Sequence, residues 1–201
     1  MNVEFHYDFG SPNAYHSHQV IKGIEARTGV AFDYVPILLG GVHKLTNNKS
    51  PMAAFGDVKG KLDYMRMDTA RFMKRHGIDK FTFNSNFPVM TIAIMRGAVY
   101  ARGKPWYRDY IDAMFHHMWE ADKKMDDPAV IGAALAESGL PAEEIFEAVQ
   151  TPEVKQGLIA TTDASVARGN FGSPCFFVDD EMFYGKETLW QVEEAILANA
   201  S

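Results

Sequence analysis

The chain has 201 residues, of which 47% are hydrophobic and 23% charged, as in a globular protein with a substantial core. Its formal net charge is −6 without a Lys/Arg-rich run, which argues against general nucleic-acid binding. A single cysteine, Cys175, excludes an intrachain disulfide and a zinc site built from cysteines. No segment approaches the roughly 20 apolar residues that span a bilayer, and the start lacks a secretory-signal pattern. We therefore expect a cytoplasmic protein that binds neither nucleic acid nor membranes.

The first fifty residues predict a strand, a helix and a second strand. Apolar side chains occupy every second position within residues 2–9, which indicates a strand. Ser11 stands where a helix N-cap is expected, Pro12 suits the first helical position, and the helix should run to about Arg27. Residues 30–39 are rich in apolar and β-branched side chains and predict another strand. The two strands of such a unit are parallel.

The middle of the chain predicts only helices, several of which begin near a proline. The predicted helices cover residues 59–76, 89–103, 106–123, 128–139 and 141–150, with one more before Gly169.

The last part predicts two short strands, Cys175–Val178 and Met182–Tyr184, around an acidic turn, and a final amphipathic helix over 186–198. The element order βαβ, helical block, ββα predicts an α/β fold in which distant halves of the chain form one mixed sheet. We expect one domain from residues 1–50 and 165–201, with residues 51–164 as an inserted helical domain. Another α/β fold with a helical insertion is the alternative from pattern alone.

Two short segments at opposite ends of the chain carry most of the functional information. The first is Tyr7-Asp8-Phe9-Gly10-Ser11-Pro12-Asn13-Ala14-Tyr15, and the second is Phe171-Gly172-Ser173-Pro174-Cys175-Phe176-Phe177-Val178-Asp179. Together they resemble the active-site turn and the cis-proline loop of a thioredoxin-like βαβ–ββα domain. Ser11-Pro12-Asn13-Ala14 stands where a thiol oxidoreductase carries Cys-x-x-Cys, so this turn lacks the thiolate that disulfide exchange needs.

The whole chain resembles the DsbA-like branch of that superfamily, and within it the 2-hydroxychromene-2-carboxylate isomerases and the kappa-class glutathione transferases. Besides the two segments above, the resemblance rests on Asn47-Asn48-Lys49-Ser50-Pro51, Lys61-Leu62-Asp63-Tyr64-Met65 with Asp68, Asn86-Phe87-Pro88, and Phe183-Tyr184-Gly185-Lys186-Glu187. The chain departs from the family pattern at Met90, where Asn is frequent, at Glu187, where Asp is frequent, and at Cys175, where Thr is common.

The resemblance implies that Ser11 activates glutathione. A hydroxyl at a helix N-terminus donates a hydrogen bond, and the helix end adds about half a positive charge, which stabilises a thiolate. Ser11 is then the catalytic residue, although it acts by hydrogen bonding and not as a covalent nucleophile. From the local sequence alone, an ordinary N-cap serine is the alternative.

The same resemblance assigns further glutathione contacts. Ser173 precedes the expected cis-Pro174, so its backbone would pair with the cysteinyl unit as a short added strand. Lys186 and Glu187 would bind the γ-glutamyl end, and Asn48 and Lys61 would bind the glycyl end or a substrate carboxylate. Each has an ordinary alternative, such as a trans proline entering an edge strand or a solvated surface lysine.

Other candidates are weaker. His116 and Glu120 share one helical face, but two ligands do not make a metal site, so no metal is expected. Cys175 is expected to be a small buried residue. Tyr7, Phe83, Phe87, Met90 and Trp106 are candidates for an aromatic substrate pocket, with core packing as the alternative.

The resemblance thus predicts a homodimeric, glutathione-dependent isomerase of aromatic-hydrocarbon catabolism. It would interconvert 2-hydroxychromene-2-carboxylate and trans-o-hydroxybenzylidenepyruvate by reversible thiolate addition. The main alternative is a kappa-like transferase that conjugates glutathione to a small electrophile. A thiol-disulfide oxidoreductase is disfavoured by Ser11 and Ala14, and a binding module without chemistry is a third alternative.

Overall fold

The computed structural model describes residues 1–199 of the chain. The elements follow one another in the order β1 (Val3–Tyr7), α1 (Pro12–Thr28), β2 (Asp33–Pro36), α2 (Leu39–Thr46), α3 (Pro51–Phe55), α4 (Lys61–His76), α5 (Ile92–Ala101), α6 (Tyr107–Trp119), α7 (Pro128–Glu137), α8 (Ala142–Ala148), α9 (Pro152–Ala167), β3 (Cys175–Val178), β4 (Glu181–Tyr184), the 3₁₀ turn η1 (Lys186–Thr188) and α10 (Leu189–Asn199).

The four strands form one mixed sheet in the order β2-β1-β3-β4. Strand β1 runs parallel to β2 and antiparallel to β3, and β3 runs antiparallel to β4. Phe5 is the centre of the register, because it lies opposite Tyr34 of β2 and Phe176 of β3. The predicted α/β fold, with a thioredoxin-like βαβ–ββα domain and a large helical insertion, is confirmed.

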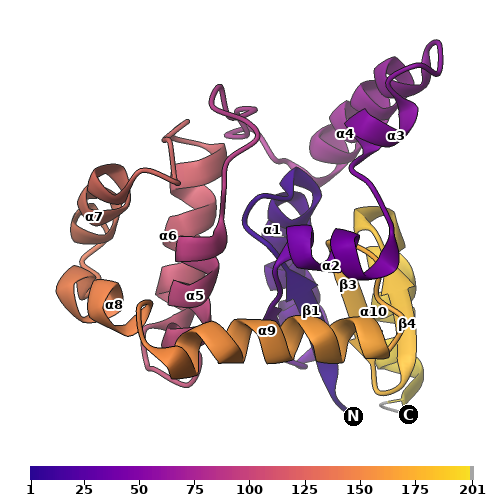
Figure 1. Cartoon of the computed structure of the whole chain (residues 1–201). Helices are drawn as coiled ribbons and strands as arrows, with labels where there is room; N and C mark the ends of the chain where they lie inside the picture. Colours follow the sequence, from indigo (N-terminus) through magenta and orange to yellow (C-terminus); the bar gives the residue numbers. More distant parts are fainter. Residues whose placement is uncertain (200–201) are drawn as a thin grey trace.

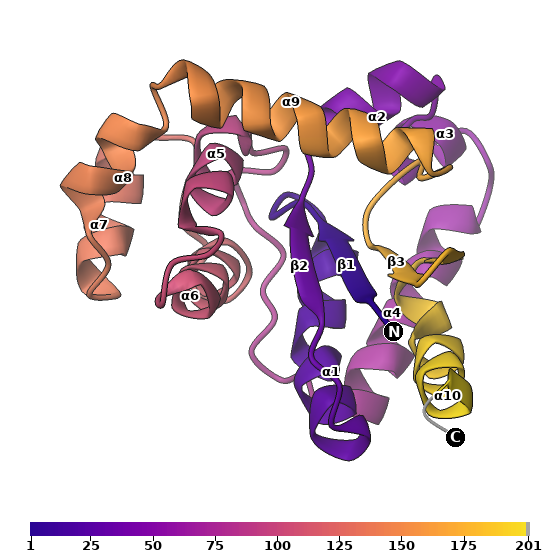
Figure 2. The same ribbon diagram turned by 90° about the horizontal axis from the view of Figure 1, so that it is seen from below.

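Helices cover both faces of the sheet. Helices α1 and α10 pack together on one face, while α9 and α2 lie on the other (Figures 1 and 2). Helices α5 to α8 form a block beside the sheet, and α3 with α4 projects away from the body as an arm. Helix α9 packs against α5 of the block and against α2 and β2. It therefore joins the two parts across the expected boundary at residues 164 and 165, and the division into two domains stays a prediction.

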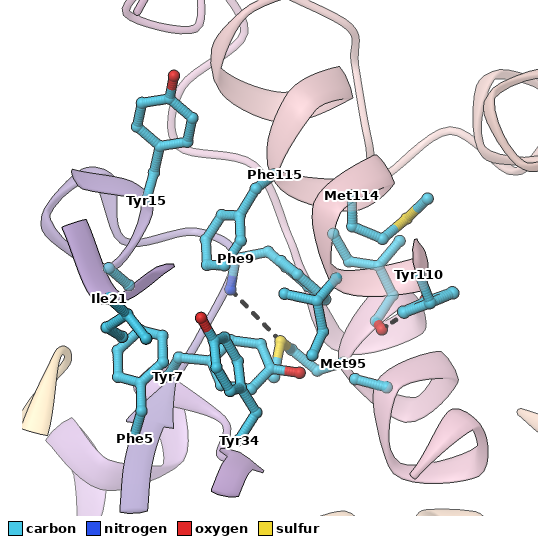
Figure 3. Packing of buried hydrophobic residues seen from close by; sticks show 14 of the residues in the cluster. Phe5, Tyr7, Phe9, Tyr15, Ile21, Tyr34, Met95, Tyr110, Met114 and Phe115 are labelled. Carbon is cyan, nitrogen blue, oxygen red and sulfur yellow. Dashed lines mark hydrogen bonds between the residues drawn. The ribbon is translucent and has the colours of Figure 1, made fainter. Parts of the chain in front are cut away.

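Aromatic side chains from β1 and from the turn that follows it build the core between the sheet and the helical block. Phe5, Tyr7 and Phe9 are fully buried, and Phe9 and Phe115 of α6 meet edge to face with ring centroids 4.9 Å apart (Figure 3). The backbone of Phe9 is also held on both sides. Its N–H contacts Sδ of Met95 at 3.4 Å, and its carbonyl accepts the indole N–H of Trp119 at 2.7 Å. The segment that leaves β1 is thereby fixed to α5 and α6.

Two local predictions were wrong. The strand expected over residues 30–39 is confined to Asp33–Pro36, because the N–H groups of Leu38 and Leu39 donate to side chains instead of a strand. Helix α5 begins at Ile92 and not near Pro88, because a turn containing the cis Phe87–Pro88 peptide comes first. The short helices α2 and α3 were not predicted, since eight and five residues give little periodic signal.

His16 on α1 is a buried polar group without a partner. Its side chain is 1% exposed, and neither ring nitrogen has a hydrogen-bond partner among the described residues. The ring lies against Phe81 at a centroid distance of 4.6 Å. Burial, with a smaller contribution from the Lys186 ammonium, lowers the pKa of His16 to about 3. A buried donor or acceptor without a partner costs stability.

We expect His16→Leu to raise the free energy of unfolding at pH 7 by about 1–3 kcal/mol, because the unpaired polar atoms are removed. The advantage over the parent should grow as the pH falls from about 6.5 toward 3. In that interval His16 is protonated in the unfolded parent but stays neutral in the folded parent, so the parent loses stability. Urea unfolding followed by circular dichroism measures both effects. His116→Leu, at a half-exposed position on α6, is the control, and an unchanged or lower stability of His16→Leu would contradict the prediction.

Candidate active site

Ser11 lies immediately before the first turn of α1. It adopts an extended backbone conformation, with φ −94° and ψ 113°, and Pro12 follows as the first helical residue. Its Oγ accepts the Ala14 N–H at 3.2 Å, which makes Ser11 the N-cap predicted from the sequence. The side chain is only 4% exposed. The hydroxyl is therefore held at the positive end of the α1 dipole with little access to bulk water.

The loop before β3 meets this turn through two hydrogen bonds, both donated by the turn and accepted by Ser173. The Ser11 hydroxyl donates to the Ser173 carbonyl oxygen at 2.9 Å, and the Asp8 N–H donates to Ser173 Oγ at 3.1 Å. The Ser173–Pro174 peptide is cis, as the resemblance implied. Segments from opposite ends of the chain are thus joined at the start of α1.

The carboxylate of Asp8 stabilises the turn by accepting three hydrogen bonds. Oδ1 accepts the Gly10 N–H at 2.8 Å and the Thr91 hydroxyl at 2.7 Å, while Oδ2 accepts the Leu39 N–H at 2.7 Å. Asp8 is 1% exposed, and burial raises its pKa, although these hydrogen bonds oppose the shift. One buried carboxylate therefore connects the active-site turn with the start of α2 and the segment before α5.

The turn that opens η1 lies beside the cis-proline. The Gly185 N–H donates to the Pro174 carbonyl oxygen at 3.0 Å, which places the next two residues next to the loop. Lys186 has a 3% exposed side chain that forms an ion pair with Glu187, and its Nζ lies 5.3 Å from the Phe72 ring centroid. The Glu187 side chain is 54% exposed. Glu187 is therefore accessible to a ligand, whereas Lys186 supports it from inside.

The structure brings Asn48 to the same loop but leaves Lys61 on the arm. The Asn48 side-chain amide donates to the Phe171 carbonyl oxygen at 2.7 Å, two residues before Ser173. Lys61 begins α4, where its Nζ lies 5.3 Å from the ring centroid of Phe55 in α3. Its proposed ligand contact stays a prediction.

An aromatic cluster flanks the turn on the side of the helical block. Phe83 and Phe87 have ring centroids 5.1 Å apart, and Phe83 lies 5.9 Å from Trp119, whose indole holds the Phe9 carbonyl. Phe83 is 51% exposed. This cluster gives the site a partly exposed aromatic wall.

The other pocket candidates lie in different surroundings. Met90 is 69% exposed, whereas Tyr7 is fully buried and its hydroxyl contacts that of Tyr107 at 3.3 Å. Trp106 packs between Tyr100 and Tyr110 at the far end of α5. Core packing is thus the observed role of Tyr7 and Trp106.

Cys175 and His116 are held in surroundings that do not favour a thiolate or a metal site. Cys175 is fully buried, and burial raises the pKa of its thiol to about 12, so a thiolate does not form near neutral pH. His116 Nδ1 contacts Glu120 Oε2 at 2.9 Å, and Glu120 also accepts the Tyr15 hydroxyl. Within residues 1–199 no group of three or more His, Cys, Asp or Glu side chains is arranged to hold a metal ion.

The site can stabilise an anion but does not activate Ser11 as a nucleophile. The hydroxyl donates to a carbonyl and accepts a backbone N–H, and none of its hydrogen-bond partners in the described part of the chain is a general base. A hydroxyl donor at a helix N-terminus, beside a cis-proline and without cysteine, suits a thiolate supplied by another molecule.

Comparison with known proteins agrees with this geometry. Residues 2–197 match the family described as the DSBA-like thioredoxin domain. The chain belongs to this family. Among its relatives is the 2-hydroxychromene-2-carboxylate isomerase of Sphingobium xenophagum, 26% identical over 97% of this chain and 97% of that protein. Human glutathione S-transferase kappa 1 is 24% identical over 86% of this chain and 78% of its own length.

The comparison with solved structures shows the same fold. A solved structure of a 2-hydroxychromene-2-carboxylate isomerase superposes with a TM-score of 0.85 at 24% identity, covering 100% of this chain and 96% of the other. The resemblance identified from the sequence motifs is therefore confirmed. No helix among the described residues is both long and apolar enough to cross a membrane.

Three residues of this DSBA-like site were not assigned a role from the sequence: Asp8, Thr91 and Trp119. Asp8 belongs to a motif that was recognised, and a carboxylate two residues before a glycine turn is a weak signal for an Asx-type contact. Thr91 and Trp119 reach the turn only through tertiary packing, so no local signal marks them.

We expect Asp8→Asn to lower the free energy of unfolding by about 1–3 kcal/mol, because an amide offers one acceptor oxygen where the carboxylate offers two. In either orientation its NH₂ group faces a backbone N–H. Urea unfolding at pH 7 measures the loss. Asp180→Asn, in the exposed turn before β4, is the matched control and should leave stability nearly unchanged. Equal stability of the two variants would show that the Asp8 contacts contribute nothing.

Proposed function

We propose that the chain is a glutathione-dependent isomerase that interconverts 2-hydroxychromene-2-carboxylate and trans-o-hydroxybenzylidenepyruvate in aromatic catabolism. The observation that carries this proposal is the Ser11 hydroxyl, which is capped onto α1 and bonded to the carbonyl that precedes cis-Pro174. Such a site favours a bound thiolate and has no cysteine of its own for disulfide exchange. Relatives named as isomerases and a kappa-class glutathione transferase support it.

The reaction explains why an external thiol is needed. Converting a cis enone into a trans enone requires rotation about a double bond, and glutathione supplies a thiolate whose reversible addition makes that bond temporarily single. The residues of this chain then have three tasks. They lower the pKa of the bound thiol, hold the substrate in place and exclude water.

Ser11 performs the first task in this proposal. Its hydroxyl turns from the Ser173 carbonyl toward the thiolate, while the N-terminus of α1 adds its dipole. The Ser173 carbonyl, released from Ser11, is then free to accept a hydrogen bond from the ligand backbone. Asp8 keeps this arrangement fixed through its bonds to Gly10, Leu39 and Thr91.

The positions of the other side chains suit the remaining contacts with glutathione and the substrate. Glu187 is exposed beside Pro174 and suits the α-amino group of the γ-glutamyl unit, with Lys186 holding its carboxylate in place. Asn48 lies at the other end of the loop, next to Phe171. Phe83 and Phe87 offer an aromatic surface to the ring of a small aromatic carboxylate.

A kappa-like transferase is the second candidate, favoured by the match to human glutathione S-transferase kappa 1. It would use the same Ser11 and the same glutathione contacts. Only the fate of the adduct differs: an isomerase returns free glutathione, whereas a transferase releases a conjugate.

We also propose that the chain forms a homodimer through its arm. None of the residues of α4 is buried, and the arm exposes a series of large apolar side chains, Met52, Phe55, Val58, Tyr64 and Met67. Large exposed apolar side chains concentrated on one projecting element are typical of an interface.

Sedimentation velocity should show a dimer that a Phe55→Ser, Met67→Ser double variant converts to monomer. Trp190→Ser, which removes an exposed large apolar side chain on α10, should stay dimeric. A parent protein that sediments as a monomer at micromolar concentration would contradict this part of the proposal.

Calorimetric titration with reduced glutathione tests the central proposal. We expect Ser11→Ala to weaken binding about tenfold, because it removes a hydrogen bond to a charged group. S-methylglutathione, which cannot form a thiolate, should bind the parent as weakly as glutathione binds the variant. The lost N-cap should cost only about 1 kcal/mol of stability. Ser17→Ala, about one and a half turns further along α1, is the control, since within residues 1–199 the Ser17 hydroxyl donates only to the Asn13 carbonyl of its own helix.

Turnover of 2-hydroxychromene-2-carboxylate then separates the two candidates. An isomerase shows product formation with catalytic amounts of glutathione, whereas consumption of glutathione with each turnover indicates a transferase. Equal glutathione affinity of the parent and Ser11→Ala would remove Ser11 from the mechanism. Absence of binding at millimolar glutathione would overturn both candidates.

A further inference from the structure

A groove between α2, α5 and α9 contains none of the residues assigned to glutathione above. Its volume is about 190 Å³, and its apolar walls come from all three helices: Leu38, Gly41, Leu45, Ile92, Leu158 and Ile159. Leu45 and Ile159 are 55% and 51% exposed, so the groove is open to solvent. Gly41 permits this geometry, because a Cβ there would lie only 3.2 Å from the Thr162 methyl group on α9.

Two cations line the same groove without a partner. Arg96 of α5 and Lys155 of α9 are both partly buried, and neither forms an ion pair or a side-chain hydrogen bond within residues 1–199. Most other Lys and Arg side chains near the body of the protein are paired, as Arg102 is with Asp33 and Arg108 with Glu25. Two like charges beside an apolar surface attract an anion that brings its own apolar body.

A third charged group, Asp163, determines which ligand charge fits the groove best. Asp163 is exposed on α9 and also lines the groove. Two cations and one carboxylate leave a local charge of +1, which matches a monoanion better than a dianion. The volume is below the roughly 300–1,000 Å³ of sites for drug-sized ligands, so the ligand is small.

We propose that this groove binds a small organic monocarboxylate with an apolar body, such as a single-ring aromatic acid. The carboxylate lies between Arg96 and Lys155, and the apolar body packs on Leu45, Ile92 and Ile159. The groove also adjoins the active-site turn. Leu38 and Ile92 are adjacent in sequence to Leu39 and Thr91, which both donate hydrogen bonds to the Asp8 carboxylate.

The site is tested by NMR titration of the full chain with benzoate in the absence of glutathione, so the result does not depend on the proposed function. We expect saturable shifts of the Leu45, Ile92 and Ile159 methyl signals. Benzamide, the neutral analogue, should bind at least about fivefold more weakly, as should inorganic phosphate, which has no apolar body.

Removing a cation and removing the carboxylate should change benzoate affinity in opposite directions. Arg96→Gln and Lys155→Gln should each weaken benzoate binding, whereas Asp163→Asn should strengthen it, because the local charge rises to +2. Ile159→Glu should abolish binding by supplying an internal carboxylate. All four positions are at least partly exposed, and thermal unfolding verifies that the variants are folded. Arg71→Gln and Lys74→Gln on α4 are matched controls that should leave binding unchanged.

Three results would overturn the proposal: benzamide or phosphate binding as tightly as benzoate, methyl shifts outside the groove only, or equal benzoate affinity of the parent and the Arg96→Gln, Lys155→Gln double variant.

Discussion

The candidate site depends on one tertiary constraint, the close approach of the turn after β1 to the loop before β3. Ser11 and Ser173 are 162 residues apart in the sequence, yet the hydroxyl of one bonds the carbonyl of the other at 2.9 Å. The antiparallel pairing of β1 with β3 brings these segments together. Because that pairing lies in the middle of the sheet, the core of the protein holds the two segments of the site together.

The helical block contributes to this contact from the other side. Trp119 and Met95 hold the backbone of Phe9, and Thr91 holds the Asp8 carboxylate. The block therefore does more than cover the site, since its contacts fix the position of the turn that contains Ser11. The same packing leaves Phe83 and Phe87 beside the turn, where an aromatic ligand can reach them.

The absence of a thiol from the turn then determines which chemistry the site can support. A thioredoxin-like scaffold presents the N-terminus of a helix to an anion, and here a hydroxyl stands at that end. Cys175, although adjacent to Pro174, is buried with a raised pKa and cannot replace the missing cysteine. Thiolate chemistry at this turn would need a thiol from another molecule, which is the physical basis for proposing glutathione. The groove lined by Arg96 and Lys155 is a second site on the same helices, for which we propose a carboxylate ligand.

The sequence by itself determined the broad order of βαβ unit, helical block and ββα unit, the mixed sheet, the family and the N-cap at Ser11, because these follow from local periodicity, from proline positions and from short motifs. Only the tertiary structure decided that Asp8 supports the turn, that Lys186 is buried against Phe72 while Glu187 is exposed, and that Lys61 lies on the arm. It also ended the second strand at Pro36, because side chains of Asp8 and Thr162 capture the next free N–H groups. These outcomes depend on contacts between residues far apart in the chain, and no local pattern encodes which partner a buried polar group will find.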